Sequence, residues 1–461
     1  MMCVYLCSSV PQAVVSIVCD PTILNRNQTV LDEIQRMTIT QRILPFLPPR
    51  RPSATMRRKR SISQNSGRLL LLLASSSRGR CMQMSSVATA TDIPNTRAVP
   101  IWYDSTNHHH RDFALYHPEQ PERITACLQA LRQESFVELI DIAAQPRPLF
   151  TTAKGEDNES TVARLSLEPF SEEELEHTRN VLLQTHAPEL VTGLERKCQE
   201  AHKRLLQEDG ENNMSTTSSL LRPMQRIDED TYLTTESWNV VLRATAAWMR
   251  AVDRALVRSG RPTFALTRPP GHHATRDNSN GFCLVNFAAA AALHAVLFRK
   301  KRVSILDWDV HYGQGVANIV AKHTHIRFAS IHQVPAFPYM GQSKQVEHGN
   351  VLTLPMPPDT TWTCGYEDLF DEALDFCYND EEWVPDLVIV SAGYDALSSD
   401  ELASCGLNAA DFGRMTRKLR QHLPSHTAIM FGLEGGYQLN NVGATGDLPQ
   451  AVVETVRAMS E

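Results

Sequence analysis

Short apolar runs alternate with longer amphipathic segments over most of the chain. The apolar runs are four to six residues long and have the length and composition of buried strands. They are Thr263–Leu266, Val303–Leu306, Ile326–Ile331, Val351–Leu354, Leu387–Val390 and Ala428–Leu433. Segments of helical character separate them, such as Phe287–Phe298, Tyr366–Cys377 and Ala409–Leu423. This alternation predicts an α/β fold in which helices cover both faces of a mainly parallel sheet.

The first 96 residues have a different pattern. Acidic residues are absent between Glu33 and Asp92, while arginines accumulate among serines. This composition is typical of a mitochondrial or plastid transit peptide. The cluster Arg57–Arg60 also fits nuclear import, and a basic tail without a targeting role is the third interpretation. Because the acidic residues near the start fit a presequence poorly, Met37 is a candidate for the working start.

These compositional differences predict a domain boundary. We expect residues 1–96 to form a disordered, basic, serine-rich segment and residues 97–461 to form the folded domain, with a polar insertion near 204–222. The apolar run Leu69–Ala74 is too short for a bilayer, which takes about 20 residues to cross. We therefore expect no membrane anchor.

Composition narrows the class of protein further. The chain has 461 residues, 42% of them hydrophobic, and a net charge of −7, which is typical of a large soluble domain. So mild an acidity provides no general attraction for nucleic acid, and no direct nucleic-acid binding is expected. The ten cysteines include no C-x-x-C pair, which argues against a disulfide framework or a cysteine zinc cluster.

The stretch Asp307-Trp308-Asp309-Val310-His311 carries the first candidate chemistry. Alternate residues of an extended chain point to the same side, so Asp309 and His311 can bind one ion. Asp395 follows another predicted strand and supplies a third ligand. Two carboxylates and one imidazole leave a coordination position open for water or substrate. This ligand set suits zinc, but Fe(II), Co(II) and Mn(II) fit as well.

Two adjacent histidines stand upstream of this metal site. His272 and His273 follow the rigid Pro269-Pro270-Gly271 turn, and their ordinary pKa of about 6.5 suits general acid and base catalysis. Asp307 lies on the same side of its strand as the ligands and is the natural carboxylate partner for His272. Tyr437 follows two glycines, which let the chain turn so that the phenol reaches a substrate carbonyl and stabilises an oxyanion.

Taken together, five strings resemble the zinc-dependent histone deacetylase and acetylpolyamine amidohydrolase superfamily, on the side of the class II-like deacetylases. They are Arg268–Ala274, Gly281–Cys283, Asp307–Gly315, Ser391–Ala396 and Leu433–Tyr437, and the resemblance extends from about Arg97 to the C-terminus. It implies an arginase-like three-layer α/β/α fold and one zinc ion per chain. It also implies that one histidine takes a proton from metal-bound water and the other holds the proton for the leaving amine.

Two positions depart from the family pattern. Gln314 stands where the family usually has an Asp or Asn partner for the second histidine, and Tyr312 stands where a histidine is most common. A glutamine cannot carry the charge of an aspartate. These departures put in question how the second histidine, His273, pairs with its partner residue. The pH optimum is in question for the same reason.

The resemblance also assigns a substrate channel. Phe282 and Phe337 match two rings that enclose the aliphatic stem of an acylated lysine, and Gly281 leaves room beside it. Asp230 matches a rim aspartate that binds substrate backbone, and Leu402 stands at the gate position, where a glutamate would mark polyamine deacetylases. Arg123 matches an arginine of the internal acetate channel. By the same resemblance, backbone carbonyls of Asp307, Asp309, His311 and Ser330 hold a structural potassium ion.

These observations predict a metal-dependent hydrolase that removes the acetyl group from the ε-amine of lysine. The expected partner is an acetylated protein or peptide, with histones among the candidates. An acetylpolyamine or other small-amide hydrolase on the same scaffold is the first alternative, and an inactive acyl-lysine-binding domain is the second. A binuclear manganese hydrolase of the arginase type would require additional bridging aspartates, which the single Asp-x-His element does not supply.

Overall fold

The computed structural model describes residues 98–112, 116–143, 170–211, 225–257, 261–379, 381–440 and 446–461, with only the backbone for 205–211. The predicted targeting segment 1–96 lies outside them. The predicted insertion near 204–222 is described only up to residue 211, where it continues a helix.

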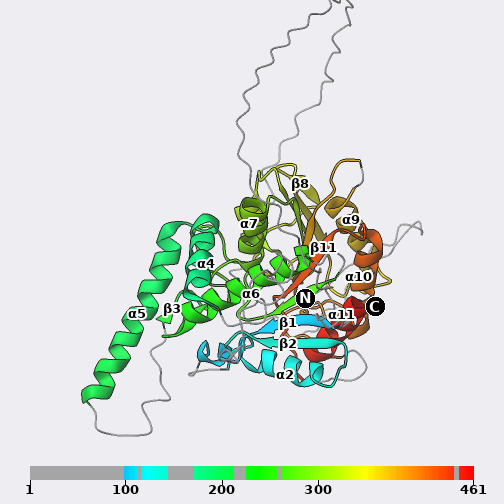
Figure 1. Cartoon of the computed structure of the whole chain (residues 1–461). Helices are drawn as coiled ribbons and strands as arrows, with labels where there is room; N and C mark the ends of the chain where they lie inside the picture. The colour runs from blue at the N-terminus through cyan, green and yellow to red at the C-terminus, as the bar shows by residue number, and fades with distance from the viewer. Residues whose placement is uncertain are drawn as a thin grey trace, which may run out of the picture. The chain divides into compact units, whose positions relative to one another are not determined.

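The centre of the described chain is a nine-stranded sheet (Figure 1). Its strands run in the order β2-β1-β5-β11-β10-β6-β7-β9-β8, and all neighbours are parallel except β8 and β9. The strands are β1 Val99–Tyr103, β2 Val137–Asp141, β5 Thr263–Leu266, β6 Val303–Asp307, β7 Ile326–Gln333, β8 Gln345–Glu347, β9 Val351–Met356, β10 Leu387–Ala392 and β11 Ala428–Leu433. A two-stranded antiparallel sheet pairs β3 Gln225–Arg226 with β4 Tyr232–Leu233.

Two layers of helices enclose this sheet. The helices are α2 Glu122–Leu131, α4 Glu172–Thr185, α5 Pro188–Glu211, α6 Ser237–Val257, α7 Phe287–Arg299, α8 Gln314–Val320, α9 Tyr366–Cys377, α10 Ala409–His422 and α11 Leu448–Ser460, with a 3-10 turn η1 at Asn107–His109. One apolar core packs α2, α9, α10 and α11 against the sheet, and the other packs α4 to α8 against the opposite face. Figure 1 shows α6 and α7 on one side and α9 to α11 on the other.

The strands supply both cores because their side chains alternate between the two faces. In β10, Leu387 and Ile389 join one core, and Val388 and Val390 join the other. Strands buried on both faces read as continuous apolar runs, which is why the sequence pattern located them. The predicted three-layer α/β/α architecture is confirmed.

Five central strands bring their carboxyl ends to one edge of the sheet. In the order of the sheet they are β5, β11, β10, β6 and β7. In open parallel sheets, ligands bind beyond these ends. Loops far apart in the sequence, including those with His272, Asp309, Asp395 and Tyr437, therefore meet there. Among the described residues, no helix is both long and apolar enough to cross a bilayer.

Candidate active site

Three potential metal ligands converge at this edge of the sheet. Asp309 and His311 follow β6, and Asp395 follows the neighbouring strand β10. His311 Nδ1 lies 3.2 Å from Asp309 Oδ1 and 3.0 Å from Asp395 Oδ2. One ligand atom from each of the three residues lies within 4.8 Å of the others. Within the described ranges, no other group of three or more His, Cys, Asp or Glu side chains meets this criterion.

The electrostatics of this cluster favour a cation. Burial opposes a charge on His311, but hydrogen bonds to Asp309 and Asp395 raise its pKa well above the ordinary value. Burial also raises the pKa of Asp395, and the neighbouring Asp309 charge adds to the effect. Two buried carboxylates this close repel each other unless a positive charge lies between them. The cluster therefore fits a divalent metal ion.

Backbone groups and a glycine hold the two carboxylates in place. Asp309 Oδ2 accepts a hydrogen bond from the Gly435 amide at 2.8 Å, and Asp395 Oδ1 accepts one from the Val310 amide at 2.9 Å. A β-carbon on Gly435 would fall inside contact distance of Asp395 Oδ2 and Asp309 Oδ2. The loop after β11 can therefore approach the carboxylates only because residue 435 has no side chain.

The histidine pair lies beside the cluster with its rings 3.9 Å apart. His272 Nδ1 is 3.1 Å from Asp307 Oδ2, and His272 Nε2 is 3.6 Å from Asp309 Oδ1. His273 Nδ1 is 2.6 Å from Gln314 Oε1, and the Gln314 amide donates back to the His273 carbonyl at 3.2 Å. Gln314, at the start of α8, thus occupies the partner position that the sequence put in question.

The two imidazoles have opposite electrostatic environments. Burial disfavours the charged form of His272, but the carboxylates of Asp309 and Asp307 outweigh it and raise its pKa to about 10. Burial lowers the pKa of His273 well below its ordinary value, and the nearby His272 and His311 lower it further. The neutral Gln314 provides no charge to oppose this. The pair therefore favours one charged and one neutral imidazole.

Tyr437 is buried beside Phe282 and Arg123. Its ring lies 5.7 Å from the ring of Phe282, in an edge-to-face arrangement. The guanidinium of Arg123 lies 4.7 Å from the centre of the Tyr437 ring. Burial raises the pKa of Tyr437 well above its ordinary value, so the phenol keeps its proton and can donate a hydrogen bond.

Two half-buried phenylalanines lie beside the site, Phe337 next to His273 and Phe282 next to Tyr437. The Phe337 ring stands edge-on to His273 at 4.8 Å, and a β-carbon on Gly281 would lie 2.7 Å from Phe337 Cε1. Gly281 also has a φ of +53°, which side chains rarely allow. Phe282 contacts Tyr437 on the other side, so the two phenylalanines lie beside different catalytic candidates.

The remaining predicted residues lie outside this centre. Asp230 is exposed, and its backbone carbonyl is 2.9 Å from His117 Nε2. Leu402 is 36% exposed. Arg123 is fully buried, where it donates from Nε to the Gly436 carbonyl at 2.7 Å and from Nη2 to the Glu434 carbonyl at 2.5 Å. Arg123 therefore lies next to Tyr437. The acetate channel assigned to it stays a prediction.

Comparison with known proteins identifies the family. The family model of the histone deacetylase domain matches residues 117–448. The chain belongs to the histone deacetylase family. Membership implies a divalent metal and an amidohydrolase reaction that removes acetyl groups, and the Asp309, His311 and Asp395 cluster is the candidate site for that metal.

Relatives of this family member come from several lineages. It is 39% identical over 236 residues to an uncharacterised protein of the cyanobacterium Synechocystis, covering 50% of this chain and 73% of that protein. It is 33% identical over 244 residues to a rice protein named histone deacetylase 10, chloroplastic, covering 50% of this chain and 52% of that one. The chain thus spans about half the length of the rice relative.

A solved structure supports the fold. The crystal structure of the HDA15 HD domain superposes with a TM-score of 0.58 at 22% identity, covering 79% of this chain and 89% of that one. At this identity the likeness supports the fold alone, and the fold is that of histone deacetylases.

The sequence interpretation of this histone deacetylase family member missed the role of Glu434. One carboxylate oxygen accepts from the amides of Gly271 and His272 at 2.6 and 3.1 Å. The other accepts from Ser391 Oγ at 2.9 Å. Glu434 therefore ties the ends of β5, β10 and β11 together. Its place before Gly435-Gly436-Tyr437 was the available signal, but its partners are mostly backbone amides, which leave no trace in a sequence.

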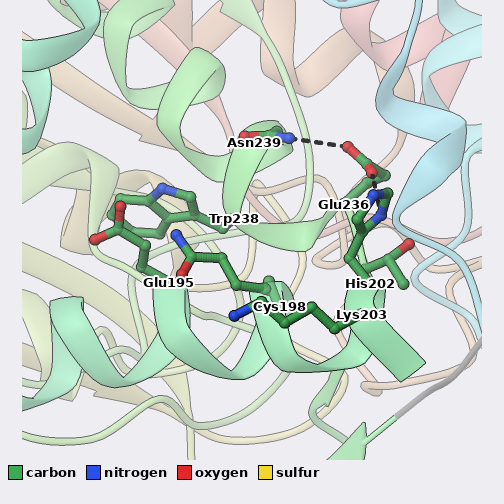
Figure 2. Close-up of a pocket in the computed structure, with 9 residues that line it drawn as sticks. Glu195, Cys198, His202, Lys203, Glu236, Trp238 and Asn239 are labelled. Carbon is green, nitrogen blue, oxygen red and sulfur yellow. Dashed lines mark hydrogen bonds and ion pairs between the residues drawn. The ribbon is translucent and has the colours of Figure 1, made fainter. Parts of the chain in front are cut away.

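A separate cavity of about 410 Å³ lies between α5 and the start of α6 (Figure 2). Figure 2 shows the side chains of Cys198, Lys203, Glu236 and Trp238 around it. Glu236 accepts a hydrogen bond from Asn239 at 2.9 Å. None of the predicted site residues of this deacetylase family member lines this cavity.

Proposed function

We propose that this chain is a metal-dependent lysine deacetylase that hydrolyses the amide of N-ε-acetyl-lysine in proteins or peptides. The observation that carries the proposal is the buried convergence of Asp309, His311 and Asp395 next to the paired imidazoles of His272 and His273. Membership of the histone deacetylase family supports it independently.

The three converging residues are the proposed metal ligands. Asp309 and Asp395 would bind through carboxylate oxygens and His311 through Nδ1. Zinc is the proposed ion, and Fe(II) or Co(II) would accept the same ligands. When bound, the ion supplies Lewis-acid polarisation of the scissile carbonyl and acidifies water. Backbone carbonyls of Asp307, Asp309, His311 and Ser330 would hold a structural potassium ion.

The two histidines would divide the proton transfer between them. His273 donates from Nδ1 to Gln314 Oε1, so its Nε2 lone pair is free to accept the proton of the attacking water. The same atom then delivers that proton to the nitrogen of the leaving amine. His272, hydrogen-bonded through Nδ1 to Asp307, would stabilise negative charge on the reacting amide.

Tyr437 would bind the oxyanion, donating its phenolic hydrogen to the substrate oxygen as charge develops. Phe282 and Phe337 would pack along the methylene stem of the acyl-lysine, and Gly281 would leave room for it. Asp230, exposed near the Phe282 loop, would accept hydrogen bonds from the substrate backbone.

The second candidate function is hydrolysis of acetylated polyamines. Glu401, an exposed acid next to Leu402, is the observation that favours it, because a carboxylate near the gate attracts a polyamine ammonium group. Leu402 itself provides no charge at the gate position. We therefore prefer the acyl-lysine substrate.

One experiment separates these possibilities. The purified full-length protein is analysed for bound metal and assayed on acetyl-lysine peptides and acetylspermidine, with and without a hydroxamate chelator. We expect about one metal ion per chain and chelator-sensitive release of acetate from the peptides. The Asp309→Ala variant serves as the metal-free control. A metal-loaded protein that hydrolyses acetylspermidine alone would contradict the preferred substrate, and one that hydrolyses neither would contradict a deacetylase.

We also propose plastid or mitochondrial targeting by the N-terminal segment. The rice relative is named chloroplastic, and the basic, serine-rich composition supports import. N-terminal sequencing of the mature protein from cells tests this. A mature chain that begins near Met1 and keeps Arg57–Arg60 would rule out cleavable import.

A further inference from the structure

Asp400 is a buried acid that the proposed reaction leaves unused. It lies in the turn after Asp395, and its two carboxylate oxygens face different segments. Oδ2 accepts from the backbone amides of Tyr437 at 2.7 Å and Gln438 at 3.3 Å. Oδ1 accepts from the Leu402 amide at 3.0 Å. This carboxylate therefore joins the turn at the predicted gate to the residue that would bind the oxyanion.

The segment that carries Tyr437 depends on such contacts. It contains Gly435 and Gly436, which have no side chain to restrict the backbone, and Gly436 has a φ of +107°. Arg123 binds the segment through its carbonyls, at Glu434 and Gly436. Asp400 binds the amides that follow. Without Asp400, the amides of Tyr437 and Gln438 would lose their carboxylate partner.

The gate turn, which contains Asp400 and Leu402, also contacts Tyr116. Glu401 Oε1 accepts a hydrogen bond from the hydroxyl of Tyr116 at 2.9 Å, and Tyr116 is 72% exposed. Gln438 Nε2 also donates to the Ser399 carbonyl at 3.1 Å. The turn is thus attached both to exposed residues and to the Tyr437 segment.

We propose that Asp400 is a positioning residue for Tyr437, holding its backbone so that the phenol points at the substrate carbonyl and linking that position to the gate at Leu402. The proposal rests on the proposed function of Tyr437. It predicts a role for a side chain whose hydrogen bonds in the described structure go to backbone amides and to none of the metal ligands or paired histidines.

The first test measures the Tyr437 segment without using activity. In Asp400→Asn, one oxygen becomes an amide nitrogen, which cannot accept, so either the Tyr437 amide or the Leu402 amide loses its partner. We expect hydrogen exchange of peptides covering 434–440 and 400–403 to accelerate about tenfold. This corresponds to a decrease of roughly 1.4 kcal/mol in the free energy of local opening. Asp411→Asn is the matched control, because Asp411 is also buried and accepts a backbone hydrogen bond, from Asn408 at 3.0 Å.

The second test is a double-mutant cycle with Tyr437→Phe. We expect Asp400→Asn to lower kcat about 10- to 100-fold, which is less than the roughly 100- to 1,000-fold loss expected when an oxyanion donor is removed. Metal content and hydroxamate affinity should not change. In the Tyr437→Phe background the same substitution should cost less than about threefold, because it acts through the phenol. The Asp411→Asn control should leave kcat unchanged in both the wild-type and the Tyr437→Phe backgrounds.

The outcomes separate the two proposals. Unchanged exchange in Asp400→Asn would overturn the positioning role, and so would fully additive losses in kcat. If the wild-type protein hydrolyses no acyl-lysine, the proposed function fails. The exchange measurement then still decides whether Asp400 holds the Tyr437 segment.

Discussion

The hydroxyl of Tyr437 is one donor in a buried aromatic environment, so its removal should change little except the reaction. Tyr437→Phe keeps the ring packed against Phe282 and under Arg123. We expect kcat to fall about 100- to 1,000-fold, as for other oxyanion donors, with metal content unchanged. Steady-state kinetics and metal analysis check this. Full activity in the variant would remove Tyr437 from the mechanism.

Gln314 provides the second residue-scale prediction, because it sets the charge around His273. Gln314→Glu has the same length and places a carboxylate where Oε1 lies 2.6 Å from His273 Nδ1. A neighbouring negative charge raises the pKa of His273, which now lies well below its ordinary value. A base must be neutral to act, so the acidic limb of the kcat/KM profile should move to higher pH.

The measurement is a pH–rate profile of the wild-type protein and Gln314→Glu, with Gln314→Met as a control of similar size that has no charge. Gln314→Met should lose rate without the upward shift of the acidic limb. If the pH–rate profiles of all three proteins coincide, Gln314 does not influence the pKa of the base, His273.

At the scale of elements, the site depends on how closely the loop after β11 approaches those after β6 and β10. Gly435 makes this approach possible. In Gly435→Ala the added methyl would overlap the carboxylates of Asp309 and Asp395, which must then move apart. We expect loss of most bound metal and of activity, measured by metal analysis after dialysis. Backbone shifts that relieve such overlap typically cost about 1–3 kcal/mol.

The control for this substitution is Gly193→Ala. Gly193 lies within α5, and an added β-carbon there meets no atom within 4 Å. In a helix, alanine is favoured over glycine by about 1 kcal/mol. Gly193→Ala should therefore keep metal and activity and melt slightly higher. Full metal occupancy in Gly435→Ala would show that the loop can recede without loss of the site.

The elements also show which parts of the molecule a sequence can predict. Strands β5, β6, β10 and β11 were located because they are buried on both faces and read as continuous apolar runs. Strands β1 and β2 were not predicted. β1 contains Pro100, and β2 is largely half-buried with acids at Glu138 and Asp141, so neither reads as a buried run.

The same physical reason limits prediction of the site. Asp309, His311, Asp395 and the histidine pair stand in short strings whose chemistry depends on residue type, and the structure brings them together. Glu434 and Asp400 act on backbone amides, which every residue except proline carries. Their partners therefore depend on the folded chain path and cannot be predicted from residue identity.

At the scale of the whole molecule, buried neutral histidines connect stability to pH. His186, at the end of α4, is 2.8 Å from the Thr275 carbonyl through Nδ1 and accepts from the Asn286 amide at 2.9 Å through Nε2. It thereby joins α4 to the loop after the histidine pair and to the start of α7. Burial lowers its pKa from 6.5 to about 4.

Because the folded-state pKa is the lower one, the unfolded chain binds a proton first as the pH falls. The contribution of His186 is therefore complete above about pH 6.5, falls between 6.5 and 4, and stays constant below. At pH 5 the loss should be roughly 2 kcal/mol, from 1.36 kcal/mol per pH unit.

His186→Gln can keep both hydrogen bonds without titrating. Urea unfolding at pH 7 and pH 5 should show a smaller loss for this variant than for the wild-type protein. Equal losses would mean that His186 is charged in the folded state or that other groups dominate the acid response.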